Sequence, residues 1–149
     1  MGVEAGLRLI GWGYPSSAVV RCRLDGRDCF RDNPSFTWRF FPAAIARTGE
    51  PFLFPAAKGE RTYRIFVLGA SAAPGTPEPA YGFSRMLKVM LDDTYPQTEF
   101  EVINAAITAI NSHVVVEIAR DCARYDPDLF LVYMGNNEVV GPYGPGTVF

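Results

Sequence analysis

The stretch Tyr63–Leu68, whose sequence is YRIFVL, decides the fold that we predict for this chain of 149 residues. Its apolar and β-favouring side chains stop at Gly69, which is the pattern of a short strand. Two further runs of this kind follow at Phe100–Ile103 (FEVI) and Leu129–Met134 (LFLVYM). Because the last run is almost entirely apolar, we predict that it is buried on both faces of its sheet.

Helical patterns separate these runs. The first is predicted over Gly82–Tyr95, and Pro96 ends it. Its apolar residues recur at helical spacing and are assigned to the core: Phe83, Met86, Leu87, Met90 and Leu91. A second helix is predicted to begin with Ser112 as its cap and to end before Asp126–Asp128. Its apolar face consists of Val114, Val115, Ile118, Ala119 and Cys122.

Strand, helix, strand, helix, strand is the pattern of βαβ units with a parallel sheet. We therefore predict an α/β domain over residues 63–149, with a three-layer, flavodoxin-like arrangement. In that arrangement the strand order is 2-1-3. The series stops after the third strand, in a stretch rich in glycine and proline, so we expect the domain to be truncated there.

Residues 1–62 have a different character. Glycine and proline interrupt every periodic run, and aromatic residues are too frequent for a solvated linker. We predict an irregular, aromatic-rich leader that packs its rings against a neighbouring surface.

Composition excludes several classes of protein. Hydrophobic residues make up 48% and charged residues 20%, as in an ordinary folded domain. A formal net charge of −2 argues against a nucleic-acid partner. The chain has one histidine and no CxxC pair, so neither a metal site nor a cofactor is expected. No run of about 18 apolar residues exists, so no membrane span is predicted.

Three cysteines are present. Cys122 falls on the apolar face of the second helix and is interpreted as a small core residue. Cys22 and Cys29 can pair in an oxidising compartment, but the sequence leaves open whether they do.

Candidate functional residues follow the three strands. In open α/β sheets, ligands bind beyond the carboxyl ends of the strands, where the strand order reverses. The three loops there read Gly69–Gly75 (GASAAPG), Asn104–Ala109 (NAAITA) and Gly135–Glu138 (GNNE). Strands one and three flank the switch point, so Ser71 and Asn137 are expected to converge.

These loops resemble the blocks of the SGNH (GDSL-like) hydrolase superfamily, over about residues 63–146. Ser71 in its Gly-x-Ser block matches the family's nucleophile. Asn137, in Gly-x-Asn-Glu, matches the family's third block. With Asn104 aligned to the second block, Ala109 stands at the position of that block's glycine. The chain is similar to the N-terminal part of such a domain, in a branch that often follows a membrane anchor and accompanies helical repeats.

The resemblance implies a serine esterase or acyl hydrolase. Ser71 attacks an ester carbonyl, while the backbone N–H groups of Ser71 and Ala109 and the Asn137 amide stabilise the oxyanion. Two departures are visible: Ala70 replaces the acidic residue that usually precedes the serine, and the family's Asp-x-x-His block is missing. The base is therefore expected downstream of this chain. The lone histidine, His113, is interpreted as a packing or capping residue.

Two other functions stay open. A hydrolase-like module without a base binds an acylated or glycan ligand or acts as a scaffold. A glycine-rich loop between strand and helix also suits phosphate, but neither Gly-Lys-Ser/Thr nor Gly-x-Gly-x-x-Gly is present. The expected partner is a small-molecule, glycan or lipid ester. The resemblance implies an extracytoplasmic or membrane-anchored location, with any anchor upstream.

Overall fold

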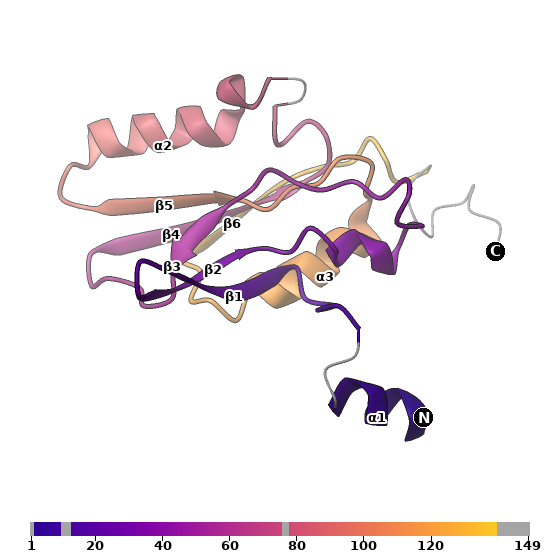
Figure 1. Ribbon diagram of the computed structural model, residues 1–149. Helices are drawn as coiled ribbons and strands as arrows, with labels where there is room; N and C mark the ends of the chain where they lie inside the picture. The colour runs from indigo at the N-terminus through magenta and orange to yellow at the C-terminus, as the bar shows by residue number, and fades with distance from the viewer. Residues whose placement is uncertain (1, 10–12, 76–77, 140–149) are drawn as a thin grey trace.

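The computed structural model describes residues 2–9, 13–75 and 78–139. A parallel sheet lies between a helix on one side and a helix with an antiparallel sheet on the other (Figure 1). Within these ranges, no helix has the length and apolar character needed to cross a membrane.

The parallel sheet contains β4 (Thr62–Gly69), β5 (Glu99–Asn104) and β6 (Leu129–Tyr133). β4 pairs with both of the other strands, so the order is β5-β4-β6. The three predicted strands, their parallel direction and their 2-1-3 order are therefore confirmed. The helices between them are α2 (Phe83–Thr94) and α3 (Ser112–Cys122).

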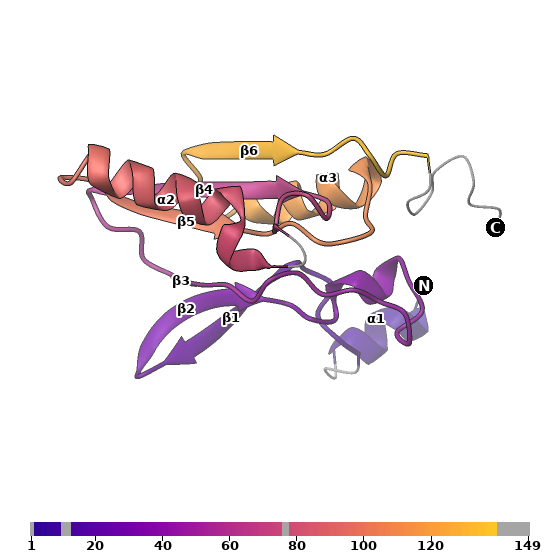
Figure 2. The same cartoon turned by 90° about the horizontal axis from the view of Figure 1, so that it is seen from above.

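α2 and α3 cover opposite faces of this sheet (Figures 1 and 2). Successive residues of β4 point to opposite faces. Val67 belongs to the apolar cluster that Phe83 of α2 joins, whereas Phe66 and Leu68 share a cluster with Val114 of α3. The buried face of α3 is the predicted one.

Two expectations about core residues are wrong. Met86 and Met90 are 52% and 66% exposed, because α2 turns a different stripe, which includes Phe83 and Leu87, toward the sheet. An additional short helix, η2 (Pro79–Tyr81), also precedes α2.

β6 is not buried on both faces, since Val132 is 57% exposed. Among the described residues β6 pairs with β4 alone, which leaves it at the sheet edge.

The leader is not irregular, which corrects the prediction for residues 1–62. It contains α1 (Gly2–Leu9), the short helix η1 (Phe36–Arg39) and a sheet of three antiparallel strands. These strands are β1 (Val19–Leu24), β2 (Arg27–Asp32) and β3 (Leu53–Pro55).

The turn between β1 and β2 explains the error. Asp25 and Gly26 form a two-residue connection, and both have positive φ, at 48° and 79°. Asp-Gly is a strong hairpin signal because both central residues of a type I′ turn need that conformation. The signal is present in the sequence, but charged residues on the exposed side of the two strands interrupt the apolar alternation.

The leader packs its aromatic rings against the parallel sheet, as predicted. Phe54 of β3 is 2% exposed, and its ring lies 5.6 Å from that of Phe66 in β4. Phe36 is equally buried and belongs to the same apolar cluster. The leader and the βα units therefore share one hydrophobic core.

Arg64 joins these two parts by polar contacts. Its side chain is 1% exposed, and its Nε donates to Glu101 at 2.5 Å. The guanidinium also donates to the carbonyl oxygens of Tyr125 and Pro55, and it lies 4.9 Å from the centre of the Phe54 ring. A buried charge is stable only when it is paired and hydrogen-bonded in this way.

Two of the three cysteines form a disulfide, and the third is a free thiol. Cys22 and Cys29 face each other across β1 and β2, with their Cα atoms 5.0 Å apart, and form a disulfide. Cys122 is fully buried on α3, and burial raises the pKa of its thiol to about 12. Cys122 is therefore a core residue, as predicted.

A candidate active site at the carboxyl ends of the parallel strands

Three loops meet where β4, β5 and β6 end (Figure 1). The backbone N–H of Ile107, in the loop after β5, donates to the carbonyl oxygen of Gly69 at 3.1 Å. Gly69 pairs with Tyr133, the last residue of β6. The topology thus brings together the three segments that carry the candidate residues.

Gly69 is required by a close approach of backbones. A Cβ built on it would lie 2.1 Å from the carbonyl oxygen of Tyr133. Any side chain would therefore push the ends of β4 and β6 apart. This contact holds the start of the first loop against the start of the third.

Ser71 lies two residues beyond Gly69, in a tight turn that begins at Ala70. The backbone N–H of Ala73 donates to the carbonyl oxygen of Ala70 at 2.9 Å. Ala70 and Ala73 are buried, while Ser71 between them is half-buried. The turn therefore holds the backbone of Ser71 on a packed base while its side chain remains partly accessible.

Ala109 has a φ of 64° and is exposed. This left-handed conformation favours glycine, because a Cβ is crowded there. Ala109 is the residue that the alignment placed at a family glycine. Its backbone conformation is thus the one in which a glycine is expected, although alanine occupies it.

Asn137 is tied to the loop after β5. Its Nδ2 donates to the carbonyl oxygen of Ile110 at 3.0 Å. A side-chain amide has two N–H bonds, and this contact uses one of them. This contact places the third block beside Ala109 and Ile110 of the second.

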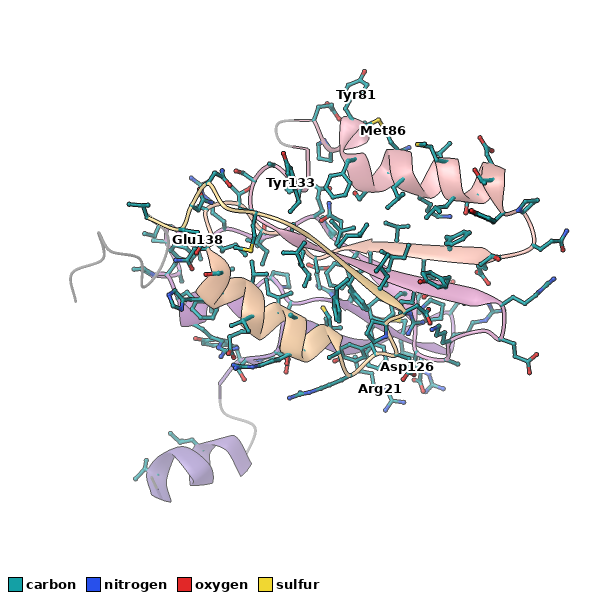
Figure 3. All side chains as sticks on the ribbon, turned by 180° about the vertical axis from the view of Figure 1, so that it is seen from behind. Arg21, Tyr81, Met86, Asp126, Tyr133 and Glu138 are labelled. Atoms are coloured by element: carbon teal, nitrogen blue, oxygen red, sulfur yellow. A yellow bond between two sulfur atoms is a disulfide. The ribbon has the colours of Figure 1, made fainter. Side chains whose placement is uncertain are left out.

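Glu138 links the loop after β6 to the start of α3. Its carboxylate accepts from the backbone N–H of Ser112 at 3.0 Å and from the Ser112 hydroxyl at 2.6 Å, at the first turn of α3 (Figure 3). The N-cap of α3 is Asn111, one residue before the predicted cap. A carboxylate at a helix N-terminus also complements the helix dipole. Local sequence patterns cannot reveal this contact, because the accepting carboxylate lies 26 residues away from Ser112.

Asn104 makes hydrogen bonds within its own loop and to α2. Its Oδ1 accepts from the backbone N–H of Ala106 at 3.2 Å. Its Nδ2 lies 3.3 Å from the Ser84 hydroxyl on α2 and donates to it. Asn104 therefore links the loop after β5 to α2.

The single histidine of the chain lies at the start of α3. His113 is exposed on the first turn of α3, next to the capped residue Ser112. Over the described ranges, no three residues among histidine, cysteine, aspartate and glutamate are grouped so as to hold a metal ion. The site therefore offers a hydroxyl, backbone N–H groups and a side-chain amide.

Comparisons of the chain with protein-family models, with curated proteins and with solved structures found no match.

Proposed function

We propose that this chain is part of a serine hydrolase that cleaves carboxylic esters, with Ser71 as nucleophile. The observation that carries the proposal is the convergence of the three loops. Asn137 is hydrogen-bonded to Ile110 in the loop after β5. Ile107 in the same loop is hydrogen-bonded to Gly69, which ends β4 two residues before Ser71. A nucleophile and oxyanion donors are the components that acyl transfer needs.

The proposed reaction has two steps. The Ser71 oxygen bonds to the ester carbonyl carbon, the bond from that carbon to the alkoxy oxygen breaks, and the serine proton passes through a base to the leaving alcohol. Water then attacks the acyl-serine, which releases the acid and restores the hydroxyl. The N–H groups of Ser71 and Ala109 and the free N–H of Asn137 are the proposed donors to the oxyanion.

The base is proposed to come from a residue downstream of this chain, because the Asp-x-x-His block of the resembled family is missing from it. We infer that the β5-β4-β6 sheet is the first half of a three-layer, flavodoxin-like domain. The exposed edge of β6 supports this inference, because parallel sheets are normally covered on both faces and continued at apolar edges. The Cys22–Cys29 disulfide supports an extracytoplasmic location, since cytosolic thiols are kept reduced.

Hydrolysis of p-nitrophenyl acetate by the natural full-length protein tests the function. We expect the Ser71→Ala variant to lose at least about 10³-fold in kcat/KM, as when a serine nucleophile is removed. Ser16→Ala, on the exposed leader, is the matched control and should keep the wild-type rate. His113→Gln should also keep it. Equal rates for wild type and Ser71→Ala would refute the nucleophile assignment.

One observation favours a second candidate function, a non-catalytic ligand-binding module. Asn137 and Glu138 both hold neighbouring loop or helix atoms, which is a sufficient structural reason for their presence. In that case Ser71→Ala leaves any esterase activity unchanged. An acetylated oligosaccharide that raises the melting temperature of both proteins equally would then support the module.

A further inference from the structure

The side chain of Asn104 contacts both of the first two loops of the candidate site. Asn104 is the last residue of β5. Its Nδ2 donates to the carbonyl oxygen of Ala73 at 3.5 Å, and its Oδ1 accepts from the backbone N–H of Ala106 at 3.2 Å. Ala73 closes the turn that carries Ser71, and Ala106 lies in the loop that leads to Ala109. One amide therefore spans the two loops.

The two backbone groups determine which side chain fits between them. The Ala106 N–H can only donate and the Ala73 carbonyl can only accept, so a shared partner needs one acceptor and one donor. An amide offers this pair on two adjacent atoms. A carboxylate of the same shape offers two acceptors, and a leucine side chain offers neither. The contacts therefore account for an asparagine at position 104 more closely than a general preference for loops does.

The atoms around this amide are well packed. Ala73 and Ala106 are fully buried and share an apolar cluster with Val67 of β4. The Nδ2 of Asn104 also donates to the hydroxyl of Ser84, which is buried in the first turn of α2. Packing thus holds the two alanines against the sheet, and the amide fixes the distance between their backbones.

The separation of these two loops matters for acyl transfer. In the proposed function, the first loop supplies the nucleophile Ser71 and the second supplies the backbone N–H of Ala109. The oxyanion forms on the carbon that the serine attacks, so the donor and the nucleophile must be held at a fixed distance. A misplacement of about 1 Å can cost about 10²-fold in rate.

We propose that Asn104 is a positioning residue, whose amide sets the distance between the Ser71 turn and the Ala109 loop. This inference rests on the proposed function. Asn104 takes no part in the bond-making steps, because its polar atoms are directed to groups of the protein. Removal of the bridge should therefore lower kcat and leave KM nearly unchanged.

The variant Asn104→Asp tests the inference in the natural full-length protein, with p-nitrophenyl acetate as substrate. It keeps the shape and the acceptor toward Ala106, but it turns the donor toward Ala73 into a second acceptor. At pH 8 we expect kcat to fall by about 10²-fold and KM to stay within about twofold.

The leader offers a matched control. The amide of Asn33 also donates to backbone carbonyl oxygens, those of Pro15 and Ser17, and accepts from the backbone N–H of Ser35. Asn33→Asp therefore breaks the same pattern of hydrogen bonds within the leader. It should lower the melting temperature about as much as Asn104→Asp does, and it should leave kcat within about twofold of the wild type.

Acid should rescue Asn104→Asp selectively. A protonated carboxyl again offers one acceptor and one donor, and partial burial beside a carbonyl oxygen raises the pKa of an introduced carboxyl. The described partners of the amide are two backbone groups and one hydroxyl, none of which titrates between pH 5 and pH 8. The general base titrates in both proteins and cancels in the ratio of their kcat values. This ratio, variant to wild type, should rise at least about threefold from pH 8 to pH 5.

A second variant covers the case in which Asn104→Asp does not fold. The hydroxyl of Asn104→Ser can still accept from the Ala106 N–H, but it is too short to reach Ala73. Its kcat should fall at least about tenfold, without recovery in acid.

The two proposals fail in different ways. Hydrolysis that requires Ser71 but keeps its kcat in both Asn104 variants overturns the positioning role and leaves the esterase assignment intact. The positioning role is also overturned by a loss that affects KM alone, that Asn33→Asp shares, or that acid does not reverse in Asn104→Asp. Hydrolysis that does not require Ser71 overturns the esterase assignment, and the positioning role with it.

Discussion

The Nδ2 of Asn137 lies 3.0 Å from the carbonyl oxygen of Ile110 and donates to it. This bond joins the loops that follow β6 and β5. It also fixes the orientation of the amide, one of whose two N–H bonds it uses. Asn137 thus has a structural role that is observed and a catalytic role that is proposed.

Asn137→Ala separates these roles. Loss of one oxyanion donor is expected to lower kcat of the full-length protein by about 10²–10³. Loss of the bond to Ile110 should lower the free energy of unfolding by only about 1 kcal/mol. Steady-state kinetics and urea unfolding measure the two effects. Asn136→Ala, at the exposed neighbouring residue, is the control and should change neither. A loss of stability without a loss of kcat would limit Asn137 to its structural role.

Ala109→Gly is expected to stabilise the protein. Alanine at a φ of 64° is strained, and glycine adopts this conformation without a Cβ clash. We expect a gain of about 0.5–1 kcal/mol in the free energy of unfolding, after allowance for the greater entropy of unfolded glycine. Ala123→Gly is the control of opposite sign. Ala123 is exposed and has an unstrained φ of −60°, so glycine there only increases the entropy of the unfolded chain and should lower the free energy of unfolding. Two losses of equal size would show that the backbone at Ala109 is unstrained.

The Cys22–Cys29 disulfide closes a short loop, with a sequence separation of seven. The double variant Cys22→Ser/Cys29→Ser is expected to lose about 2 kcal/mol of stability, mainly because its unfolded chain is freer. Thermal unfolding with and without dithiothreitol measures this. Reductant should lower the melting temperature of the wild type and leave that of the double variant unchanged. Because Cys122 is buried, its thiol should react with Ellman's reagent only after unfolding.

Asp128 makes stability depend on acid pH. Partial burial raises the pKa of its carboxyl, but hydrogen bonds from the Lys58 ammonium at 2.5 Å and the Arg64 backbone N–H at 2.6 Å outweigh burial and hold it below the ordinary range. A folded-state pKa that is depressed contributes stability above the unfolded-state pKa of about 3.9, and this contribution is lost as pH falls through the folded-state value.

The difference in melting temperature between wild type and Asp128→Asn should therefore be constant near neutral pH and shrink below about pH 4. Asp93→Asn, on the exposed end of α2, serves as the control and should show a smaller and flatter difference. A difference between wild type and Asp128→Asn that stays constant from pH 7 to pH 3 would contradict the assignment.

Local patterns were sufficient for much of the main sheet. The apolar run at Tyr63–Leu68 and its two successors became β4, β5 and β6, because short β-favouring runs separated by helical patterns have few other ways to be buried. The errors at α2, at β6 and in the leader have physical reasons, since β6 lies at the sheet edge and Val132 is exposed there. Met86 and Met90 follow helical spacing, but only packing decides which stripe of a helix faces the sheet. The leader hairpin was missed although Asp25–Gly26 signals it.

The candidate site was partly accessible to sequence reasoning. Strand order placed the loops of Ser71 and Asn137 at one edge of the sheet, and the family resemblance pointed to Ala109 in the loop after the second strand. Those three loops do meet there. The hydrogen bonds from Ser112 to Glu138 were not foreseen. They join residues that are 26 positions apart and become neighbours only after the strands pair.

The sequence by itself determined the strands, the helices between them and the polar residues at the strand ends, because periodicity and turn residues are local properties. Tertiary structure alone decided which helix face is buried, that β6 has an open edge, and that Asn137 bonds to Ile110. These are long-range contacts, whose geometry follows from how strands twist, pair and pack rather than from any single stretch of residues.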